Sequence, residues 1–165
     1  MFRYKTKKMQ RPWNLPSLPV YSLATYAAGK VNMNICTYVT AVSLKPKWMA
    51  VAVYEGTKTL QNLEQNQRAV LQLLGANQYP LVNHLGKKSG KKVDKDSWLH
   101  KKQMTMNWKG HTVLKGCAAC MELSYKTHLT TGDHRLYLFE VTKASSFHSE
   151  LLTTQILSLH KIIRI

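Results

Sequence analysis

Short apolar runs and alternating apolar and polar residues follow one another along most of the chain, a pattern that predicts strands rather than long helices. Residues 19–26 and 31–40 form two such segments, separated by four residues that include Gly29. This spacing predicts a β-hairpin, because glycine supplies the positive φ that tight turns need. Residues 48–54 are almost continuously apolar, so we expect a central strand there.

Three more segments have the composition of strands: residues 69–74, 111–125 and 135–142. The turn sequence at 130–133 joins the last two. Because no regular alternation of strands and helices is present, the pattern argues against a doubly wound parallel sheet. It favours a mostly β fold, an antiparallel barrel of six or seven strands with short helices.

Two short helices are expected between these strands. Thr57 or Thr59 can cap a helix that places Leu60 and Leu63 on one face, and residues 77–85 predict a second helix. The C-terminal residues 149–165 leave two interpretations open, because their apolar residues repeat at helical spacing but end in a β-branched run that suits an edge strand.

The 165-residue length predicts one folded domain, residues 19–165, preceded by a proline-containing arm at residues 1–18. Three cysteines, an odd and small number, suggest a reducing compartment. No run approaches the 18 or so apolar residues that a membrane span requires, and prolines follow the basic N-terminus where a secretory signal needs its apolar stretch. The expected location is therefore the cytoplasm, with no membrane partner.

The charge is unusual, since 24 Lys and Arg residues against 8 Asp and Glu residues leave a net charge of +16. Such a field attracts polyanions, acidic surfaces or phosphorylated small molecules. Seven lysines lie between residues 84 and 102, and this segment is interpreted as a solvated loop. Single-stranded nucleic acids need aromatic side chains among the basic ones, and only Trp98 meets that condition here, so nucleic-acid binding is disfavoured.

Several familiar motifs are absent or incomplete. No Gly-x-Gly-x-x-Gly follows a strand, and the segment 86–92 differs from a P-loop in its glycine spacing and in the residue after its lysine. Cys117 and Cys120 form a Cys-x-x-Cys pair, which with His128 and His134 resembles a zinc site. If the segment is a strand, the two cysteines point to opposite faces and cannot share a metal, so no metal site is expected.

A phosphate site is the more useful hypothesis. Lys58 lies between two threonines at the start of the first helix, where free backbone N–H groups and the helix dipole favour an anion. A simple capped helix with a solvated lysine is the alternative. Polar residues on otherwise apolar strands either bond to each other or face a planar heteroaromatic ligand; they are Asn32, Asn34, Thr37 and Ser43.

With these residues in order along the chain, the sequence resembles the flavin reductase-like, FMN-binding split-barrel family over residues 18–142. The matching segments are Val31 to Thr37, Val42-Ser43 before Pro46, Lys58-Thr59 with Asn62-Leu63, and Gly132-Asp133-His134 leading into residues 136–141. The resemblance implies a six-stranded antiparallel split β-barrel with short helices and bound FMN.

The resemblance also implies roles for particular residues. Asn34, Ile35, Cys36, Thr37 and Ser43 would line the isoalloxazine and ribityl groups, Lys58, Thr59 and Asn62 would hold the phosphate, and His134 would orient a ring at the catalytic end. It implies a homodimer and hydride transfer from NAD(P)H to the flavin, with electrons passed on to oxygen, a partner oxygenase or another acceptor.

Two departures from the family pattern stand out. Lys45-Pro46-Lys47 replaces a common Pro-Pro pair, and Phe139 occupies a position that is often glycine. Two other functions stay open at this stage. One is a non-enzymatic FMN electron carrier, since the positive charge favours docking of an acidic redox partner. The other, less favoured, is a basic nucleic-acid-binding barrel.

Overall fold

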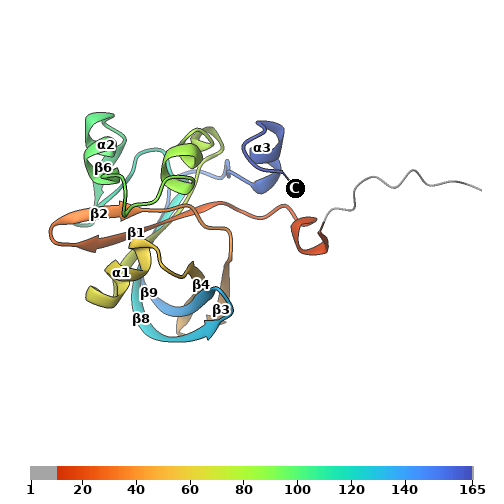
Figure 1. Ribbon diagram of the computed structural model, residues 1–165. Coiled ribbons are helices and arrows are strands. Elements are labelled where there is room, and N and C mark those ends of the chain that lie inside the picture. The colour runs from red at the N-terminus through yellow and green to blue at the C-terminus, as the bar shows by residue number, and fades with distance from the viewer. Residues whose placement is uncertain (1–10, 165) are drawn as a thin grey trace, which may run out of the picture.

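The computed structural model describes residues 11–164, whose strands form a seven-stranded antiparallel sheet and a separate two-stranded sheet (Figure 1). The large sheet has the order β2-β1-β5-β8-β9-β4-β3, and β6 pairs with β7. The strands are β1 Tyr21–Ala27, β2 Lys30–Met33, β3 Val39–Leu44, β4 Lys47–Tyr54, β5 Arg68–Leu73, β6 Thr105–Trp108, β7 His111–Leu114, β8 Ala119–Thr131 and β9 His134–Ser146.

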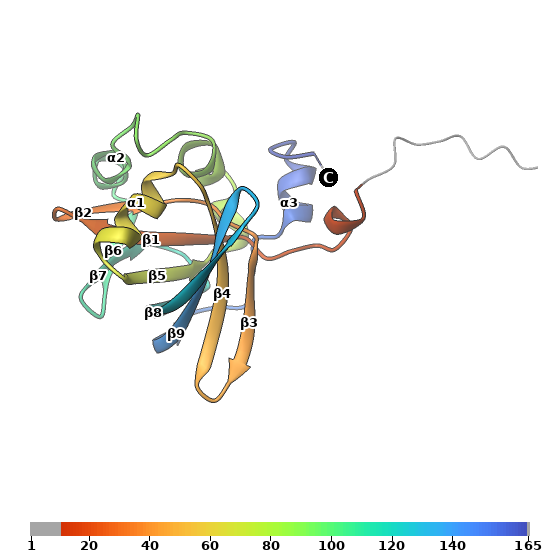
Figure 2. The ribbon, with the colours of Figure 1, turned by 60° about the horizontal axis from the view of Figure 1, so that its bottom comes forward.

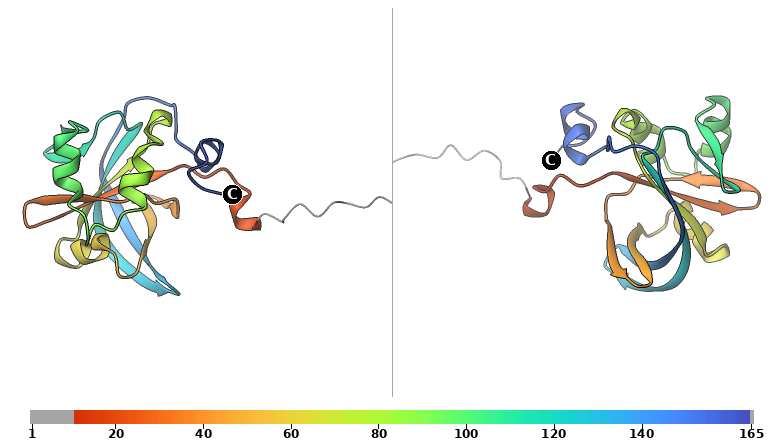
Figure 3. Two further views of the ribbon diagram at one scale, coloured as in Figure 1. Left: turned by 45° about the horizontal axis from the view of Figure 1, so that its top comes forward. Right: turned by 180° about the vertical axis from the view of Figure 1, so that it is seen from behind.

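Short helices connect and cover these strands. They are α1 Lys58–Gln65, α2 Lys95–Lys101 and α3 Thr154–Leu159, with 3-10 turns η1 Pro12–Asn14 and η2 Ala76–Gln78 and a π-helical turn η3 Val82–Gly86. Helices α2 and α3 lie on one side of the β1–β2 hairpin and α1 lies on the other (Figures 1 and 3). The prediction of a mostly β, antiparallel fold with short helices is confirmed.

The large sheet is strongly curled. Strands β1, β2 and β5 run across the view of Figure 2, whereas β3, β4, β8 and β9 cross them in the other direction. The long strands β8 and β9 pair along almost their whole length and carry the sheet through this bend, with two register shifts along their pairing. Strands β2 and β3 form the two edges, and no pairing between them closes the sheet within the described residues.

The predicted strand boundaries needed three corrections. The segment 31–40 is not one strand, because β2 ends at Met33 and the chain crosses to the opposite edge of the sheet before β3 begins. The segment 111–125 is divided between β7 and β8 by a turn in which Gly116 has a φ of +77°. Strand β6 was not predicted, and the described residues therefore contain nine strands rather than six or seven.

The helix predictions fared differently. Helix α1 begins after Thr57, whose side-chain oxygen accepts a hydrogen bond from the backbone N–H of Leu60, as the capping argument predicts. Residues 77–85 hold parts of η2 and η3 rather than one helix, and the expected loop at 84–102 contains α2. Of the two interpretations of the C-terminal segment, the structure shows a helix, α3, rather than an edge strand.

The core divides into two clusters on the two faces of the sheet. Neighbouring β1 residues show the division, since Leu23 belongs to one cluster and Ala24 to the other. The cluster of Leu23 packs under α1, which contributes Leu60 and Leu63. The cluster of Ala24 packs under α2, α3 and the β6–β7 hairpin. The fully buried Phe139, one of the departures from the family pattern, stacks on Tyr137.

Of the predicted arm at 1–18, residues 1–10 lie outside the described part. Residues 11–18 include η1 and reach the C-terminal region, where Leu18 exchanges hydrogen bonds with Thr154. Among the described helices, none has the length and apolar character needed to cross a membrane.

Candidate functional site

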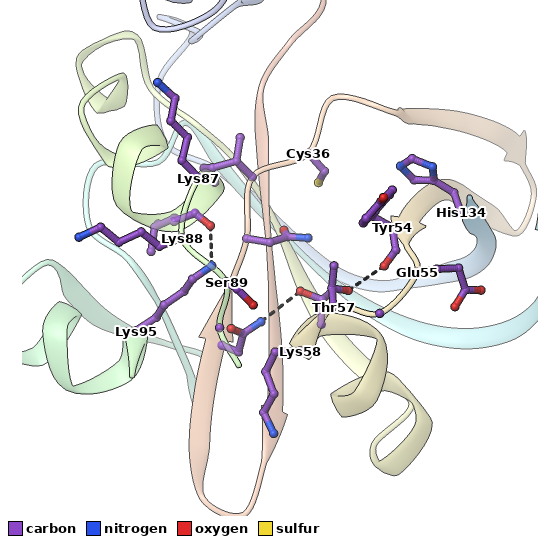
Figure 4. Close-up of a pocket in the computed structure, with 18 of the residues that line it drawn as sticks. Cys36, Tyr54, Glu55, Thr57, Lys58, Lys87, Lys88, Ser89, Lys95 and His134 are labelled. Carbon is purple, nitrogen blue, oxygen red and sulfur yellow. Dashed lines mark hydrogen bonds between the residues drawn. The ribbon is translucent and has the colours of Figure 1, made fainter. Parts of the chain in front are cut away.

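A cavity of about 530 Å³ lies where the start of α1, the connection between β2 and β3, and the loop after η3 meet (Figure 4). His134, at the start of β9, lies at its far end. The lining residues are Asn32, Asn34, Ile35, Cys36, Thr37, Tyr38, Ala52, Tyr54, Glu55, Gly56, Thr57, Lys58, Thr59, Leu85, Gly86, Lys87, Lys88, Ser89, Gly90, Lys95 and His134.

The start of α1 forms one wall. Thr57 caps the helix and donates its hydroxyl hydrogen to the carbonyl of Tyr54, at 2.9 Å. The backbone N–H groups of Lys58 and Thr59 belong to the first helical turn, where no carbonyl of the helix can accept from them. This wall therefore presents free N–H donors and the positive end of the helix dipole to the cavity, and Lys58 is among the lining residues.

The loop after η3 forms the facing wall and touches the first wall at Gly90. A Cβ atom at this position would lie 2.2 Å from Asn32 Oδ1 and 3.1 Å from Lys58 Cβ. Asn32 is itself held, because its Nδ2 donates to Thr59 Oγ1 over 3.1 Å. Only glycine allows this close approach, so Gly90, Asn32 and Thr59 fix the spacing of the two walls.

Lys95, the first residue of α2, holds the facing wall in place by hydrogen bonds. Its ammonium donates to the carbonyls of Met33, at 3.1 Å, and Leu85, at 2.5 Å. The side chain is 5% exposed, and burial lowers the pKa of Lys95 to about 8. An ammonium has three donors, and the two carbonyls use two of them. The third donor has no hydrogen-bond partner within the described residues, and Lys95 is among the residues that line the cavity.

The connection between β2 and β3 forms the floor. Asn34 accepts a hydrogen bond from the backbone N–H of Leu23 through Oδ1, at 3.0 Å. Cys36 and Tyr21 form a two-bond antiparallel bridge. Burial raises the pKa of the Cys36 thiol to about 12, so the thiol is neutral at physiological pH. These bonds to β1 hold residues 34–37 rigidly against the cavity.

The far end of the cavity is aromatic. Antiparallel pairing of β4 with β9 places Tyr54 opposite His134, and their rings meet edge to face at 5.1 Å. Tyr38 approaches the same imidazole at 5.7 Å. Asp133 Oδ1 lies 2.6 Å from His134 Nδ1, which leaves Nε2 as the free ring nitrogen. This arrangement orients the imidazole at the far end of the cavity.

The structure brings most of the predicted site residues together. Seven of them line this one cavity: Asn34, Ile35, Cys36, Thr37, Lys58, Thr59 and His134. Ser43 does not, because it lies on the edge strand β3 opposite Trp48. Asn62 does not either, since its Nδ2 donates to Thr25 Oγ1 over 3.2 Å behind α1.

Sequence reasoning missed the facing wall, because the lysines of 84–102 were interpreted as a solvated loop. Leu85 and Leu99 are buried in the core, and Lys95 is buried beside the cavity. The signal was present: Asp94 caps α2 by accepting from the backbone N–H of Ser97, and Leu99 lies four residues after Lys95. A helix cap within the segment would have indicated an ordered wall.

The argument about the Cys-x-x-Cys pair was also wrong in its geometry. Cys117 lies in the turn after Gly116 and not on a strand, so its Sγ approaches Cys120 Sγ to 3.4 Å. Both cysteines are free thiols, buried in the core. No group of three or more potential metal ligands is found within residues 11–164.

Comparison with known families identifies the domain. A model of the flavin reductase-like domain matches residues 15–157. The chain belongs to the flavin reductase-like family. The cavity described above therefore lies in a flavin reductase-like domain, and the resemblance noted from the sequence is confirmed.

Solved structures agree with the family at the level of the fold. An FMN-binding protein from Thermus thermophilus, solved with 1-cyclohex-2-enone, has a TM-score of 0.72 and 22% identity over 88% of this chain and 80% of that one. A flavoredoxin from Methanosarcina acetivorans has a TM-score of 0.72 and 20% identity over 86% of this chain and 76% of that one. The styrene monooxygenase flavin reductase of Pseudomonas putida S12 has a TM-score of 0.67 and 20% identity over 80% of this chain and 82% of that one. Comparison with curated protein sequences gives no match.

Proposed function

We propose that this flavin reductase-like protein binds FMN in the cavity and acts as an NAD(P)H-dependent oxidoreductase. The observation that carries the proposal is the polarity of the cavity, which has cationic and N–H donors at one end and aromatic rings at the other. FMN has the same polarity, with a phosphate at one end and a planar ring system at the other. The cavity volume also lies within the usual range for small-molecule sites, roughly 300–1,000 Å³.

The residues at the α1 end would hold the phosphate. The first-turn N–H groups and Lys58 on one wall and Lys95 on the other would supply donors to the phosphate. Ser89 adds a hydroxyl from the facing wall. A phosphomonoester carries about two negative charges, which these two lysines balance. Gly90 leaves the space that the two walls need to reach one phosphate.

The floor and the aromatic end would position the reacting rings. Bound FMN supplies the chemistry of a hydride acceptor and donor. Residues 34–37 hold one edge of the site rigid, and His134, oriented by Asp133 and Tyr54, fixes the approach of a second ring. Hydride transfer depends mainly on holding donor and acceptor carbon and nitrogen close together, so His134 acts by orientation rather than as an obligatory base.

The proposal extends to assembly and fold type. We infer a homodimer, in keeping with exposed apolar side chains at Val42 and Leu44 on edge strand β3 and at Leu129 on the β8–β9 hairpin. We also infer that the curled sheet corresponds to the split barrel of the family. A cytoplasmic location stays a prediction from the sequence.

The first test is the visible absorption spectrum of the purified protein with added FMN, titrated under argon with NADH and then NADPH. Bound-flavin bands that bleach rapidly with either nucleotide are expected. Bands that bleach only with dithionite would instead support an FMN electron carrier, a function that the fold shared with a flavoredoxin keeps in view. The absence of any bound flavin would contradict both functions.

The role of His134 is tested by His134→Ala under the same anaerobic conditions. We expect slower flavin reduction and weaker nicotinamide binding, because the ring that fixes the second reactant is missing. Unchanged values for both would show that His134 has only a structural role.

A further inference from the structure

Four lysines follow one another along the loop between η3 and α2, beside the proposed FMN cavity. We call them the lysine rim: Lys87, Lys88, Lys91 and Lys92. All four are exposed, and none forms an ion pair with another residue in the described part of the chain. The rim is therefore a dense, unneutralised positive patch.

The acidic residues of the protein do not offset this patch. Seven of the eight carboxylates already lie within ion-pair distance of a lysine, arginine or histidine elsewhere: Glu55, Glu64, Asp94, Asp96, Glu122, Asp133 and Glu140. Asp94, the nearest one to the rim in sequence, pairs with Lys30 at 2.7 Å and caps α2. The field of the rim thus extends into solvent.

The rim also has more charge than the proposed cofactor needs. Figure 4 shows the ammonium groups of Lys87 and Lys88 pointing away from the cavity. The phosphate end has Lys58 and the buried Lys95 for its two negative charges. The four rim lysines are therefore free to contact another molecule that approaches the flavin site.

We propose that the lysine rim is a docking surface for an acidic electron-acceptor protein, which receives electrons from the flavin in the adjacent cavity. This inference rests on the proposed function. With a one-electron haem acceptor the reaction balances as NADH plus two ferric haems giving NAD⁺, two ferrous haems and one proton. Complementary charge of this kind raises association rates and selects partners.

A nucleic acid is the other polyanion that lysines attract, and the rim fits it less well. Binding of single strands uses exposed aromatic rings that stack on bases. The loop carries no aromatic residue between 85 and 92, and the nearby Trp98 is already stacked on His84 at a ring distance of 3.7 Å. An acidic protein needs only the charge pattern that is present.

The test uses the soluble domain of cytochrome b5, an acidic haem protein, as the probe. The charge-reversal variant Lys91→Glu/Lys92→Glu is compared with Lys102→Glu/Lys115→Glu, which changes the net charge equally at exposed lysines outside the lysine rim. At low salt and saturating FMN, we expect the rim variant to reduce cytochrome b5 at least 10-fold more slowly than the control variant. Lys91→Gln/Lys92→Gln should fall between them.

Binding is measured separately from turnover, by calorimetric titration of oxidised cytochrome b5 into the protein with and without FMN. The rim variant should lose affinity in both forms. Equal losses in the two reversal variants would reduce the effect to net charge and overturn the proposal, as would no loss in either. A sequence-preferring oligonucleotide complex at physiological salt that the rim variant abolishes, with no affinity for cytochrome b5, would assign the rim to nucleic acid.

The two levels of the proposal fail in different ways. If NAD(P)H does not reduce bound flavin, the proposed reductase activity fails, while the calorimetric comparison still tests docking. If NADH reduces bound flavin, small uncharged quinones serve as control acceptors and should be reduced equally fast by all variants. A slower rate that is confined to cytochrome b5 reduction by the rim variant then assigns the defect to docking.

Discussion

The two walls of the proposed FMN cavity are built in opposite ways. The α1 wall is local: a capping threonine, a lysine and a second threonine occupy three consecutive positions, and regular helix geometry aims their donors. The facing wall is non-local. Its lysine-rich loop is held by Lys95, whose ammonium reaches carbonyls on β2 and in η3, and by Gly90, which rests on Asn32.

This difference determines how each wall responds to change. A helix start keeps its N–H donors when one side chain is lost, because the backbone supplies them. The facing wall depends on a buried cation and on one contact that excludes a Cβ atom. We therefore expect steric change at Gly90 to have a larger effect than removal of any single charge from the α1 wall.

The largest effect is expected from Gly90→Val. The new side chain would collide with Asn32 and Lys58 and break the Asn32–Thr59 hydrogen bond that joins the walls. Overpacking of this kind costs about 1–3 kcal/mol, and loss of the phosphate alignment adds to it. We expect the Kd for FMN, measured by fluorescence titration, to rise by more than 100-fold.

Ser89→Ala is the matched control for this variant, because it alters the neighbouring residue without adding volume. Its Kd for FMN should rise by less than about 10-fold, the value of one neutral hydrogen bond. A folded Gly90→Val protein with nearly normal FMN affinity would show that the facing wall does not contact the cofactor.

The second effect tests the α1 wall. Lys58→Ala should weaken FMN binding by roughly 1.5–3 kcal/mol, about 10- to 150-fold, because a charged donor to the phosphate is lost. Riboflavin, which has no phosphate, should bind as it does to the unaltered protein. Equal losses for both flavins in a folded variant would remove Lys58 from the phosphate site.

The contrast between local and non-local construction also explains what the sequence could predict. Helix α1, its cap and the β1–β2 hairpin follow from neighbouring residues and were predicted. The approach of Gly90 to Asn32 and the contact of buried Lys95 with the Met33 carbonyl join residues about 60 positions apart, and single-sequence patterns do not indicate such contacts. The chain's departure from the β2 direction at Met33 was missed for the same reason, since residues 31–40 read as one strand.

The pairing of the two cysteines is a smaller case of the same limit. A strand assignment implies opposite faces for residues three apart. Gly116, with its positive φ, turns the chain just before Cys117 and removes that premise. The glycine was visible in the sequence, whereas the exact start of β8 was not.

The third effect uses pH to examine the facing wall. Burial lowers the pKa of Lys95 from 10.5 to about 8, so the free protein loses this charge as the pH rises through 8. Phosphate binding favours the charged ammonium, so the Kd for FMN should rise by up to tenfold per pH unit above pH 8. Titrations at pH 7, 8 and 9, with riboflavin in parallel, measure this slope.

The sign of the stability change is the opposite of the affinity change. Between pH 8 and 10.5 the unfolded chain binds the Lys95 proton while the folded, flavin-free protein releases it. The unfolding free energy of the flavin-free protein therefore gains a rising contribution from Lys95 over this window. In Lys95→Met both Lys95-dependent slopes should vanish, and a persistent FMN slope would assign the pH dependence to another group.

The smallest effect on FMN affinity is expected at Asn62. This residue packs behind α1 and stabilises the wall without lining the cavity. Its Nδ2 donates to Thr25, while its buried Oδ1 has no hydrogen-bond partner. Asn62→Ala should lower the unfolding free energy in urea by about 1 kcal/mol, because a buried hydrogen bond is lost together with an unpaired oxygen. Its Kd for FMN should change less than twofold.

Thr59→Val, one helical turn earlier, keeps the side-chain shape but removes the oxygen that accepts from Asn32, and should weaken FMN binding several-fold. If Asn62→Ala weakens FMN binding more than Thr59→Val does, the back of α1 contacts the phosphate, and the boundary of the α1 wall must be moved to include Asn62.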